Sequence, residues 1–185
     1  MYELHENEQY FFDQPTLRGL TDFVVDGAFQ APCCLCCPLL GQSLAQRRVP
    51  VRILDSDERF GATSGFTLYD IYRPAWTGES YDLIICDPPF FKVSLSQLFK
   101  AVRTLSRHDF SQPLLLCYLS RRAPNVLGTF ARFELRATGL RPGYQTVQNT
   151  PRNEIEFFSN LPPDSVEKLR QSLAGGATAT SHILL

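Results

Sequence analysis

The hydrophobic residues of this chain fall into short, unbroken runs that are separated by polar and turn-forming segments. Such runs lack the polar alternation of a half-exposed strand, and they are typical of strands buried on both faces, as in a parallel sheet. The run YDLIIC, at 81–86, is the strongest and stops at an Asp-Pro-Pro sequence. The pattern predicts five such strands, at 31–37, 51–55, 66–69, 81–86 and 114–119.

Segments with apolar residues three and four positions apart lie between these runs and predict helices. In 95–105 five apolar side chains share one helical face, and 15–25 begins with Pro15, which suits a first turn. Two late strands, at 133–137 and 154–158, have no helix between them, which predicts an antiparallel hairpin at one edge. The rest of the alternation predicts an α/β sandwich with a mostly parallel sheet. The other predicted helices are 39–47, 126–130 and 161–173.

Length and composition fit one ordinary globular domain. Of the 185 residues, 44% are apolar and 20% are charged, so a sizeable core is available. We expect an N-terminal aromatic segment at 1–14, a single domain at 15–173 and a disordered tail at 174–185. No run of 18 apolar residues predicts a membrane span, and the polar, acidic start resembles no targeting peptide. These features predict a cytoplasmic protein.

Six cysteines raise the question of a metal site. The run 33–37 contains two overlapping C-x-x-C spacings. A structural zinc site needs four ligands, but the chain has no second cysteine pair and its three histidines are scattered. We therefore expect no metal, and we expect these small, apolar side chains to fill a buried strand.

The residues just after the predicted strands carry most of the polar chemistry. In open α/β sheets, ligands bind beyond the carboxyl ends of the strands, near the point where the strand order reverses. We therefore expect the functional site at these positions. They are Pro38, Asp55, Asp57, Asp70 and the tetrapeptide 87–90.

Asp87, Pro88, Pro89 and Phe90 form the most specific of these groups. Two successive prolines fix two φ angles and supply no backbone N–H, and a residue before a proline is pushed toward an extended conformation. The turn is therefore rigid and offers only acceptors, which are the Asp87 carboxylate and the carbonyls of Asp87 and Pro88. An amino group donates hydrogens to such acceptors, which directs its lone pair toward an electrophile. Phe90 adds an aromatic face for a flat base or for the stem of a cationic substrate.

This tetrapeptide resembles the (Asn/Asp)-Pro-Pro-(Tyr/Phe) signature of class I amino-methyltransferases, which methylate adenine, cytosine, glutamine or lysine nitrogens. More narrowly, the chain resembles the probable N6-adenine methyltransferases, a family that includes lysine methyltransferases of elongation factor 1A and a relative that acts on ribosomal RNA adenosine. The likeness spans roughly 8–160. It implies a Rossmann-like class I methyltransferase fold and S-adenosylmethionine as the cofactor. The other segments that carry it are 9–13, 33–38, 55–60, 69–70 and 153–157.

The resemblance also implies roles for particular residues. The acidic group after the second strand would hold the ribose hydroxyls of the cofactor, and the Arg-Phe pair that follows it favours Asp57 over Asp55. Asp70 would accept a hydrogen bond from the adenine amino group of the cofactor. Asn153 and Glu154 would complete the cage around the substrate amine. The residues implied to contact the cofactor are Gln9, Tyr10, Phe11, Pro38, Asp57 and Asp70.

The chain departs from many methyltransferases after the first strand. The place of their G-x-G-x-G loop reads Pro38-Leu39-Leu40-Gly41 here, and the narrower family lacks those glycines as well. This departure keeps open a non-catalytic module that has a methyltransferase fold and binds a partner. A nicotinamide oxidoreductase is disfavoured, because the chain has no G-x-G-x-x-G.

The acceptor is predicted to be a protein lysine, with an adenine of RNA or DNA as the alternative. A net charge of −1 and a pI near 6.3 show no bias toward nucleic acid. A nucleic acid would need a positive track, for which Arg121 and Arg122 are available. The acceptor nitrogen would attack the methyl group in line, without a metal or a covalent intermediate. A lysine must first lose a proton, and Asp87 is the candidate to accept it.

Overall fold

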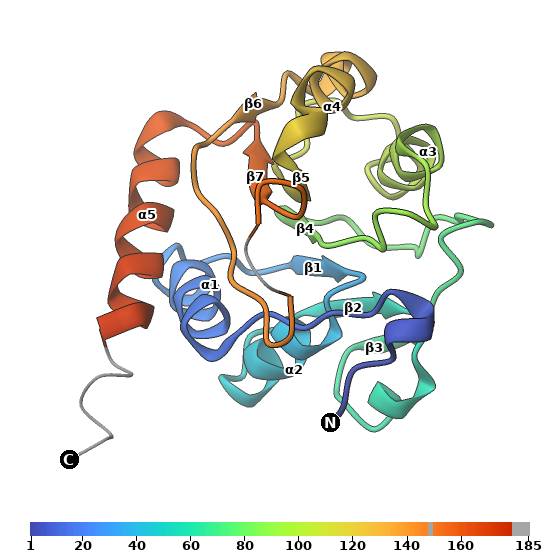
Figure 1. Cartoon of the computed structure of the whole chain (residues 1–185). Coiled ribbons are helices and arrows are strands. Elements are labelled where there is room, and N and C mark those ends of the chain that lie inside the picture. Colours follow the sequence, from blue (N-terminus) through green and yellow to red (C-terminus); the bar gives the residue numbers. More distant parts are fainter. Residues whose placement is uncertain (148–149, 179–185) are drawn as a thin grey trace.

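The computed structural model describes residues 1–147 and 150–178, which build a seven-stranded sheet with helices on both faces (Figure 1). The strands are β1 (Pro32–Leu35), β2 (Arg52–Asp55), β3 (Phe66–Leu68), β4 (Leu83–Cys86), β5 (Leu114–Leu119), β6 (Arg136–Ala137) and β7 (Ile155–Ser159). The α-helices are α1 (Gln14–Asp26), α2 (Pro38–Gln46), α3 (Leu95–Leu105), α4 (Ala123–Thr129) and α5 (Pro163–Thr178). Short 3₁₀ turns are η1 (His5–Asn7), η2 (Glu58–Phe60), η3 (Ser120–Arg122) and η4 (Ala131–Phe133).

The strand order is β3-β2-β1-β4-β5-β7-β6. Strands β1 to β5 pair in parallel, whereas β7 pairs antiparallel with both β5 and β6. The predicted α/β sandwich with a mostly parallel sheet and an antiparallel edge is therefore confirmed. The order reverses between β1 and β4, so a ligand site is expected at the carboxyl ends of these two strands.

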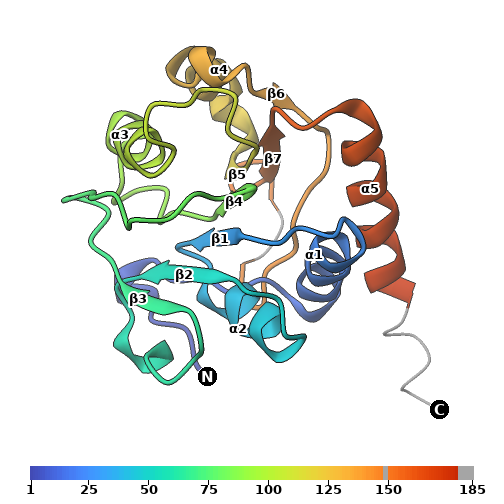
Figure 2. The same cartoon turned by 180° about the vertical axis from the view of Figure 1, so that it is seen from behind.

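The helices cover the sheet in two layers, with α1, α2 and α5 on one face and α3 and α4 on the other (Figures 1 and 2). Every residue of β1, β4 and β5 is buried, which agrees with their unbroken apolar sequences. Of the cysteines predicted to fill a buried strand, Cys33 and Cys34 lie in β1, whereas Cys36 and Cys37 lie in the turn after it. Cys86 and Cys117 fill buried positions in β4 and β5. No helix in either described range is both long enough and apolar enough to cross a membrane.

The C-terminal helix extends further than the sequence predicted. The disordered tail was expected from residue 174, but α5 continues to Thr178, and 179–185 lie outside the described residues. Gly176 packs so closely on α1 that a Cβ there would lie 2.3 Å from the Pro15 carbonyl oxygen. The Arg18 guanidinium also donates to the Gly176 carbonyl, at 3.0 Å. Contact with α1 thus holds a glycine-rich sequence in a helix despite its low helical propensity.

The N-terminal segment continues directly into α1 and crosses the carboxyl edge of the sheet. Asp13 caps α1 by accepting the Thr16 N–H, at 2.9 Å. Just before it, Phe12 forms an isolated antiparallel bridge with Tyr144, in the connection between β6 and β7. The segment therefore lies over the strand ends where the sequence placed the functional site.

Candidate active site

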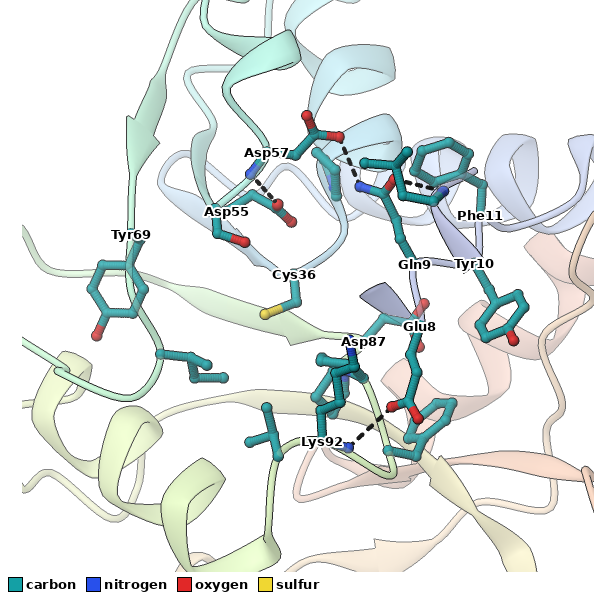
Figure 3. A pocket seen from close by; sticks show the side chains of 18 of the residues that line it. Glu8, Gln9, Tyr10, Phe11, Cys36, Asp55, Asp57, Tyr69, Asp87 and Lys92 are labelled. Carbon is teal, nitrogen blue, oxygen red and sulfur yellow. Dashed lines mark hydrogen bonds between the residues drawn. The ribbon is translucent and has the colours of Figure 1, made fainter. Parts of the chain in front are cut away.

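The carboxyl ends of β1, β2 and β4 open into a cavity of about 580 Å³ (Figure 3). Its size is within the usual range for small-molecule and cofactor sites. The N-terminal segment and Tyr144 form part of its wall. The residues that the sequence predicted as catalytic or cofactor-contacting all line it: Gln9, Tyr10, Phe11, Pro38, Asp57, Asp70, Asp87, Pro88, Pro89 and Phe90.

Asp87 follows β4 directly and is only 8% exposed. Its backbone N–H donates to the Leu35 carbonyl at 3.1 Å, which fixes it at the reversal point between β1 and β4. Burial raises the pKa of its carboxyl to about 8, against the lowering effect of hydrogen bonds from Tyr144 and Cys117. The Tyr144 hydroxyl donates to Asp87 Oδ1 at 2.7 Å. A carboxyl group that can hold or release a proton near neutral pH thus faces the cavity.

The two prolines after Asp87 turn the chain away from the sheet. The Val93 N–H donates to the Pro89 carbonyl at 3.0 Å and closes the turn. In the described ranges, no backbone hydrogen bond reaches the carbonyls of Asp87 or Pro88. The Phe90 ring packs edge-on against Tyr118, with 5.4 Å between the ring centroids. The turn therefore presents free acceptors beside a fixed aromatic ring.

The end of β2 brings two carboxylates to the cavity, and their hydrogen bonds differ. Asp55 is the last residue of the strand and is 8% exposed. It accepts the Asp57 N–H at 2.8 Å and also the Ser56 N–H. Burial raises the pKa of Asp55 to about 6. A carboxylate has about four lone-pair sites, so two backbone donors leave Asp55 with capacity for a ligand.

Asp57 is already held by other side chains. Both of its oxygens accept from Arg59, at 2.6–3.1 Å, and Oδ2 also accepts from Gln9 Nε2 at 2.8 Å. The hydrogen bonds from Arg59 lower the pKa of Asp57, so it is ionised at neutral pH. Asp57 therefore fastens the N-terminal segment to the end of β2, and it has less capacity left for a ligand than Asp55 has.

A tight turn after β1 replaces the glycine-rich loop. Cys36 has the left-handed φ of 58°, its N–H donates to the Leu54 carbonyl at 2.9 Å, and α2 begins at Pro38. The Cys36 side chain points into the cavity (Figure 3), and burial raises the pKa of its thiol. The thiol is therefore uncharged at neutral pH. Among the described residues, no group of three or more His, Cys, Asp or Glu side chains is arranged to hold a metal ion.

Beyond the end of β3, the cavity wall changes from apolar to polar. Tyr69 and Ile71 are each 8% exposed and supply apolar surface. Asp70 lies between them, is exposed, and accepts the Tyr72 N–H at 2.9 Å through Oδ1. This part of the cavity suits a flat heterocycle with one polar edge.

Glu8 joins the N-terminal segment to the Pro-Pro turn. Its carboxylate accepts the N–H groups of Phe91 and Lys92, at 3.1 and 3.0 Å. Together with the Gln9–Asp57 contact, this bond ties one short segment to the ends of both β2 and β4 (Figure 3). No sequence pattern predicted this contact, because an acidic residue in a polar segment carries no information about which residue it will contact.

Replacing Glu8 with glutamine is expected to loosen the Pro-Pro turn. A neutral amide oxygen is a weaker acceptor than a carboxylate, because charged hydrogen bonds are about twice as strong as neutral ones. We expect hydrogen exchange at Phe91 and Lys92 to accelerate by about tenfold, measured by mass spectrometry of peptides that cover 88–93. Glu6→Gln is the matched control, since Glu6 is exposed and its side chain lacks this contact. Equal exchange in both variants would contradict the role of Glu8.

A second cavity, of about 230 Å³, shares part of its lining with the first. Tyr10, Phe90 and Tyr144 line both cavities. Asn153, predicted to bind the substrate, lines the second cavity, whereas Glu154 lines neither and pairs with Arg141 at 3.0 Å. The lining residues are Tyr10, Phe90, Phe91, Leu119, Tyr144, Thr146, Val147, Asn153 and Ile155. Phe90, Tyr10 and Tyr144 thus form a wall that the larger cavity shares with the small aromatic one.

A family model described as probable N6-adenine methyltransferase matches residues 3–162. The chain belongs to this family. No curated protein sequence matches it significantly. The family match covers the cavity and both carboxylates of β2, and it extends through β7. Its start at residue 3 includes the N-terminal segment that carries Glu8 and Gln9.

Solved structures place this family member in the class I methyltransferase fold. A magnesium protoporphyrin IX methyltransferase from Synechocystis PCC 6803, solved with bound SAM, is 16% identical with a TM-score of 0.53, covering 80% of this chain and 79% of that one. A TehB-like SAM-dependent methyltransferase from Corynebacterium glutamicum ATCC 13032 is 14% identical with a TM-score of 0.53, covering 78% and 88%. At this identity the likeness concerns the fold. Family and fold together identify a methyltransferase.

Proposed function

We propose that this protein is an S-adenosylmethionine-dependent N-methyltransferase whose acceptor is the side-chain amine of a protein lysine. The observation that carries the proposal is Asp87, a buried carboxyl group that lines the cofactor-sized cavity and accepts a hydrogen bond from Tyr144, a residue that lines both cavities. Membership of a methyltransferase family and the class I fold support the reaction type and the cofactor.

The chemistry of the larger cavity fits S-adenosylmethionine. Asp55 has spare lone pairs at the end of β2, where two vicinal ribose hydroxyls can donate to one carboxylate. Tyr69 and Ile71 offer apolar surface for the adenine ring, with Asp70 at its edge. We assign the ribose hydroxyls to Asp55 rather than to Asp57, because Arg59 and Gln9 already occupy the Asp57 oxygens.

Asp87 and the Pro88 carbonyl would hold the acceptor nitrogen, and S-adenosylmethionine supplies an electrophilic methyl group when it is bound. A lysine enters as an ammonium group and donates hydrogen bonds to both oxygens. One proton moves to the ionised form of Asp87, which becomes populated as the pH approaches its pKa of about 8. The freed lone pair then points along the direction of attack. Product release returns the proton from Asp87 to solvent.

The second cavity supports lysine as the acceptor. Its volume of about 230 Å³ is below the usual range for sites that enclose drug-sized ligands, so it suits an aminoalkyl chain better than a nucleoside. Tyr10, Phe90, Phe91 and Tyr144 surround it with aromatic rings. Such rings attract ammonium and methylammonium groups through cation–π contacts. Aromatic walls that lead to a buried carboxylate are a suitable environment for a lysine side chain.

A specific observation favours an adenine acceptor as the second candidate. Arg121 and Arg122 lie in η3, the turn after β5, and Arg121 Nε donates to the Arg152 carbonyl at 3.1 Å, next to Asn153 of the second cavity. Arginines near the second cavity can bind the phosphates of a nucleic acid. An adenine amine is neutral and needs only hydrogen-bond acceptors, which the Pro-Pro turn supplies.

The two acceptors are separated by methyl transfer from labelled S-adenosylmethionine into fractionated cell lysate. We expect label in the protein fraction, released as methyl-lysine on hydrolysis, and absent when Asp87→Ala is the enzyme. A lysate whose lysines have been reductively dimethylated is the matched control, because it removes lysine acceptors and leaves adenines unchanged.

The other outcomes favour the alternative functions. Label that survives lysine blocking and appears in N6-methyladenosine would replace the lysine proposal with the adenine alternative. No label in any fraction, together with no thermal stabilisation by S-adenosylmethionine or S-adenosylhomocysteine, would favour the non-catalytic binding module.

A further inference from the structure

Tyr144 lies in the irregular connection between β6 and β7, outside every motif that the sequence singled out. Backbone contacts with the N-terminal segment fix its position. The Gln145 N–H donates to the Phe11 carbonyl and the Asp13 N–H donates to the Gly143 carbonyl, each at 2.9 Å. The Tyr144 ring also packs on Phe12, with 5.3 Å between centroids. The backbone bonds on both sides of Tyr144 therefore set its position independently of its own hydroxyl.

The hydroxyl of Tyr144 reaches the carboxyl group at the centre of the site. It donates to Asp87 Oδ1 at 2.7 Å, a short distance for a hydrogen bond between side chains. The Cys117 thiol, from β5, hydrogen-bonds to the same carboxyl group. The Tyr144 hydroxyl therefore occupies Oδ1 of this carboxyl group.

The other groups that face Asp87 are uncharged thiols. They come from the turn after β1 (Cys36 and Cys37), from β4 (Cys86) and from β5 (Cys117), and burial raises the pKa of each. Burial likewise raises the pKa of the Tyr144 hydroxyl. In the described ranges no cation appears among the groups that shift the pKa of Asp87. Tyr144 is thus the main polar partner of this carboxyl group.

We propose that Tyr144 is a positioning residue for methyl transfer, which holds Asp87 Oδ1 so that Oδ2 is directed at the acceptor nitrogen. This inference rests on the proposed function, because it assigns Tyr144 a part in the same reaction. Tyr144 acts through Asp87, and its ring forms the wall shared by the two cavities. The N-terminal segment, which covers the larger cavity, thereby also determines the geometry at the acceptor.

Tyr144→Phe tests this proposal, since it removes one oxygen atom and keeps the ring and the backbone bridge. We expect kcat to fall by about tenfold, the cost of losing one hydrogen bond to a charged group, while the KM for S-adenosylmethionine changes less than twofold. The acidic limb of the kcat–pH profile should move to higher pH, because the carboxylate loses a donor that favours its ionised form. Tyr81→Phe is the control; it removes another buried hydroxyl, bonded to Thr77 at the far end of β4.

The hydrogen bond between Tyr144 and Asp87 can also be tested in the absence of catalysis. Carboxyl carbon-13 NMR, with the Asp87 resonance assigned through Asp87→Asn, should give a higher pKa for Asp87 in Tyr144→Phe than in the wild type. If the Asp87 pKa rises in this way but the wild-type protein transfers no methyl group, the contact is supported and the proposed function is contradicted. An unchanged Asp87 pKa, or a lower kcat with an unmoved acidic limb, would overturn the positioning role.

Discussion

Asp87→Asn is expected to lower methyl transfer to lysine by about a thousandfold, the range assigned to a positioned general base. The asparagine side chain has nearly the same shape and keeps an oxygen for the Tyr144 hydroxyl, so the turn should keep its geometry. It cannot take a proton from an ammonium group, and it cannot compensate the charge of that group. The measurement is single-turnover methyl transfer at pH 8, with saturating S-adenosylmethionine.

Asp87→Ala provides the comparison that identifies the acceptor. With a lysine acceptor, both variants should lose activity to a similar extent, because neither can accept a proton. With an adenine acceptor, the asparagine variant should keep most of its activity, since the amide oxygen still accepts a hydrogen bond from a neutral amine. Full activity in Asp87→Ala would remove Asp87 from the reaction.

The Asp87→Asn substitution is also expected to stabilise the fold. The pKa of Asp87 is raised from its ordinary 3.8 to about 8 by burial. Between these values the unfolded chain releases a proton that the folded chain retains, so the free energy of unfolding decreases as pH rises from about 4 to 8. Removing this titration should add on the order of 5 kcal/mol at pH 8 and almost nothing at pH 4. Urea unfolding at the two pH values measures the difference.

Asp55→Asn is expected to weaken binding of S-adenosylhomocysteine by about thirtyfold. Two hydroxyl groups would donate to the Asp55 carboxylate, and hydrogen bonds to a charged group each contribute about 1.5–3 kcal/mol. Isothermal titration measures the affinity. The 2′-deoxy analogue of the ligand lacks one of these hydroxyls, so the variant should discriminate against it less than the wild type does.

Asp57→Asn is the matched control for Asp55, two residues away in the same turn. The pKa of Asp57 is lowered by its bonds with Arg59, so this carboxylate stabilises the fold above its ordinary pKa, and that stability is lost as pH falls through the folded value. We expect a loss of about 1 kcal/mol at pH 7 and a smaller effect on affinity. A larger loss of affinity in Asp57→Asn than in Asp55→Asn would restore Asp57 as the ribose contact.

The sequence alone predicted the sheet well, because the relevant signals are local. An unbroken apolar run such as 81–86 specifies a strand buried on both faces, wherever its neighbours lie in the chain. The absence of a helix between the last two strands predicted the antiparallel edge. The tail was predicted less well, since Gly176 is helical only through its close contact with α1.

For the site, the sequence supplied the residue types and the structure supplied their partners. Asp87 was identifiable because two prolines follow it at a strand end. The preference for Asp57 over Asp55 could not be checked in the sequence, since it depends on which carboxylate Arg59 and Gln9 engage. Glu154 was expected at the substrate amine. It pairs with Arg141 and lines neither cavity.

The sequence by itself determined a mostly parallel α/β sheet and a rigid turn of hydrogen-bond acceptors at the end of its fourth strand. These features follow from the period of hydrophobic residues and from the fixed φ angles of proline, which act between neighbours in the chain. Only the tertiary structure decided that Tyr144 meets Asp87, 57 residues away, and that Glu8 meets Phe91, 83 residues away. Such contacts arise when the folded sheet brings distant segments to one edge. A single tyrosine or glutamate has no local sequence pattern that predicts which residue it will contact.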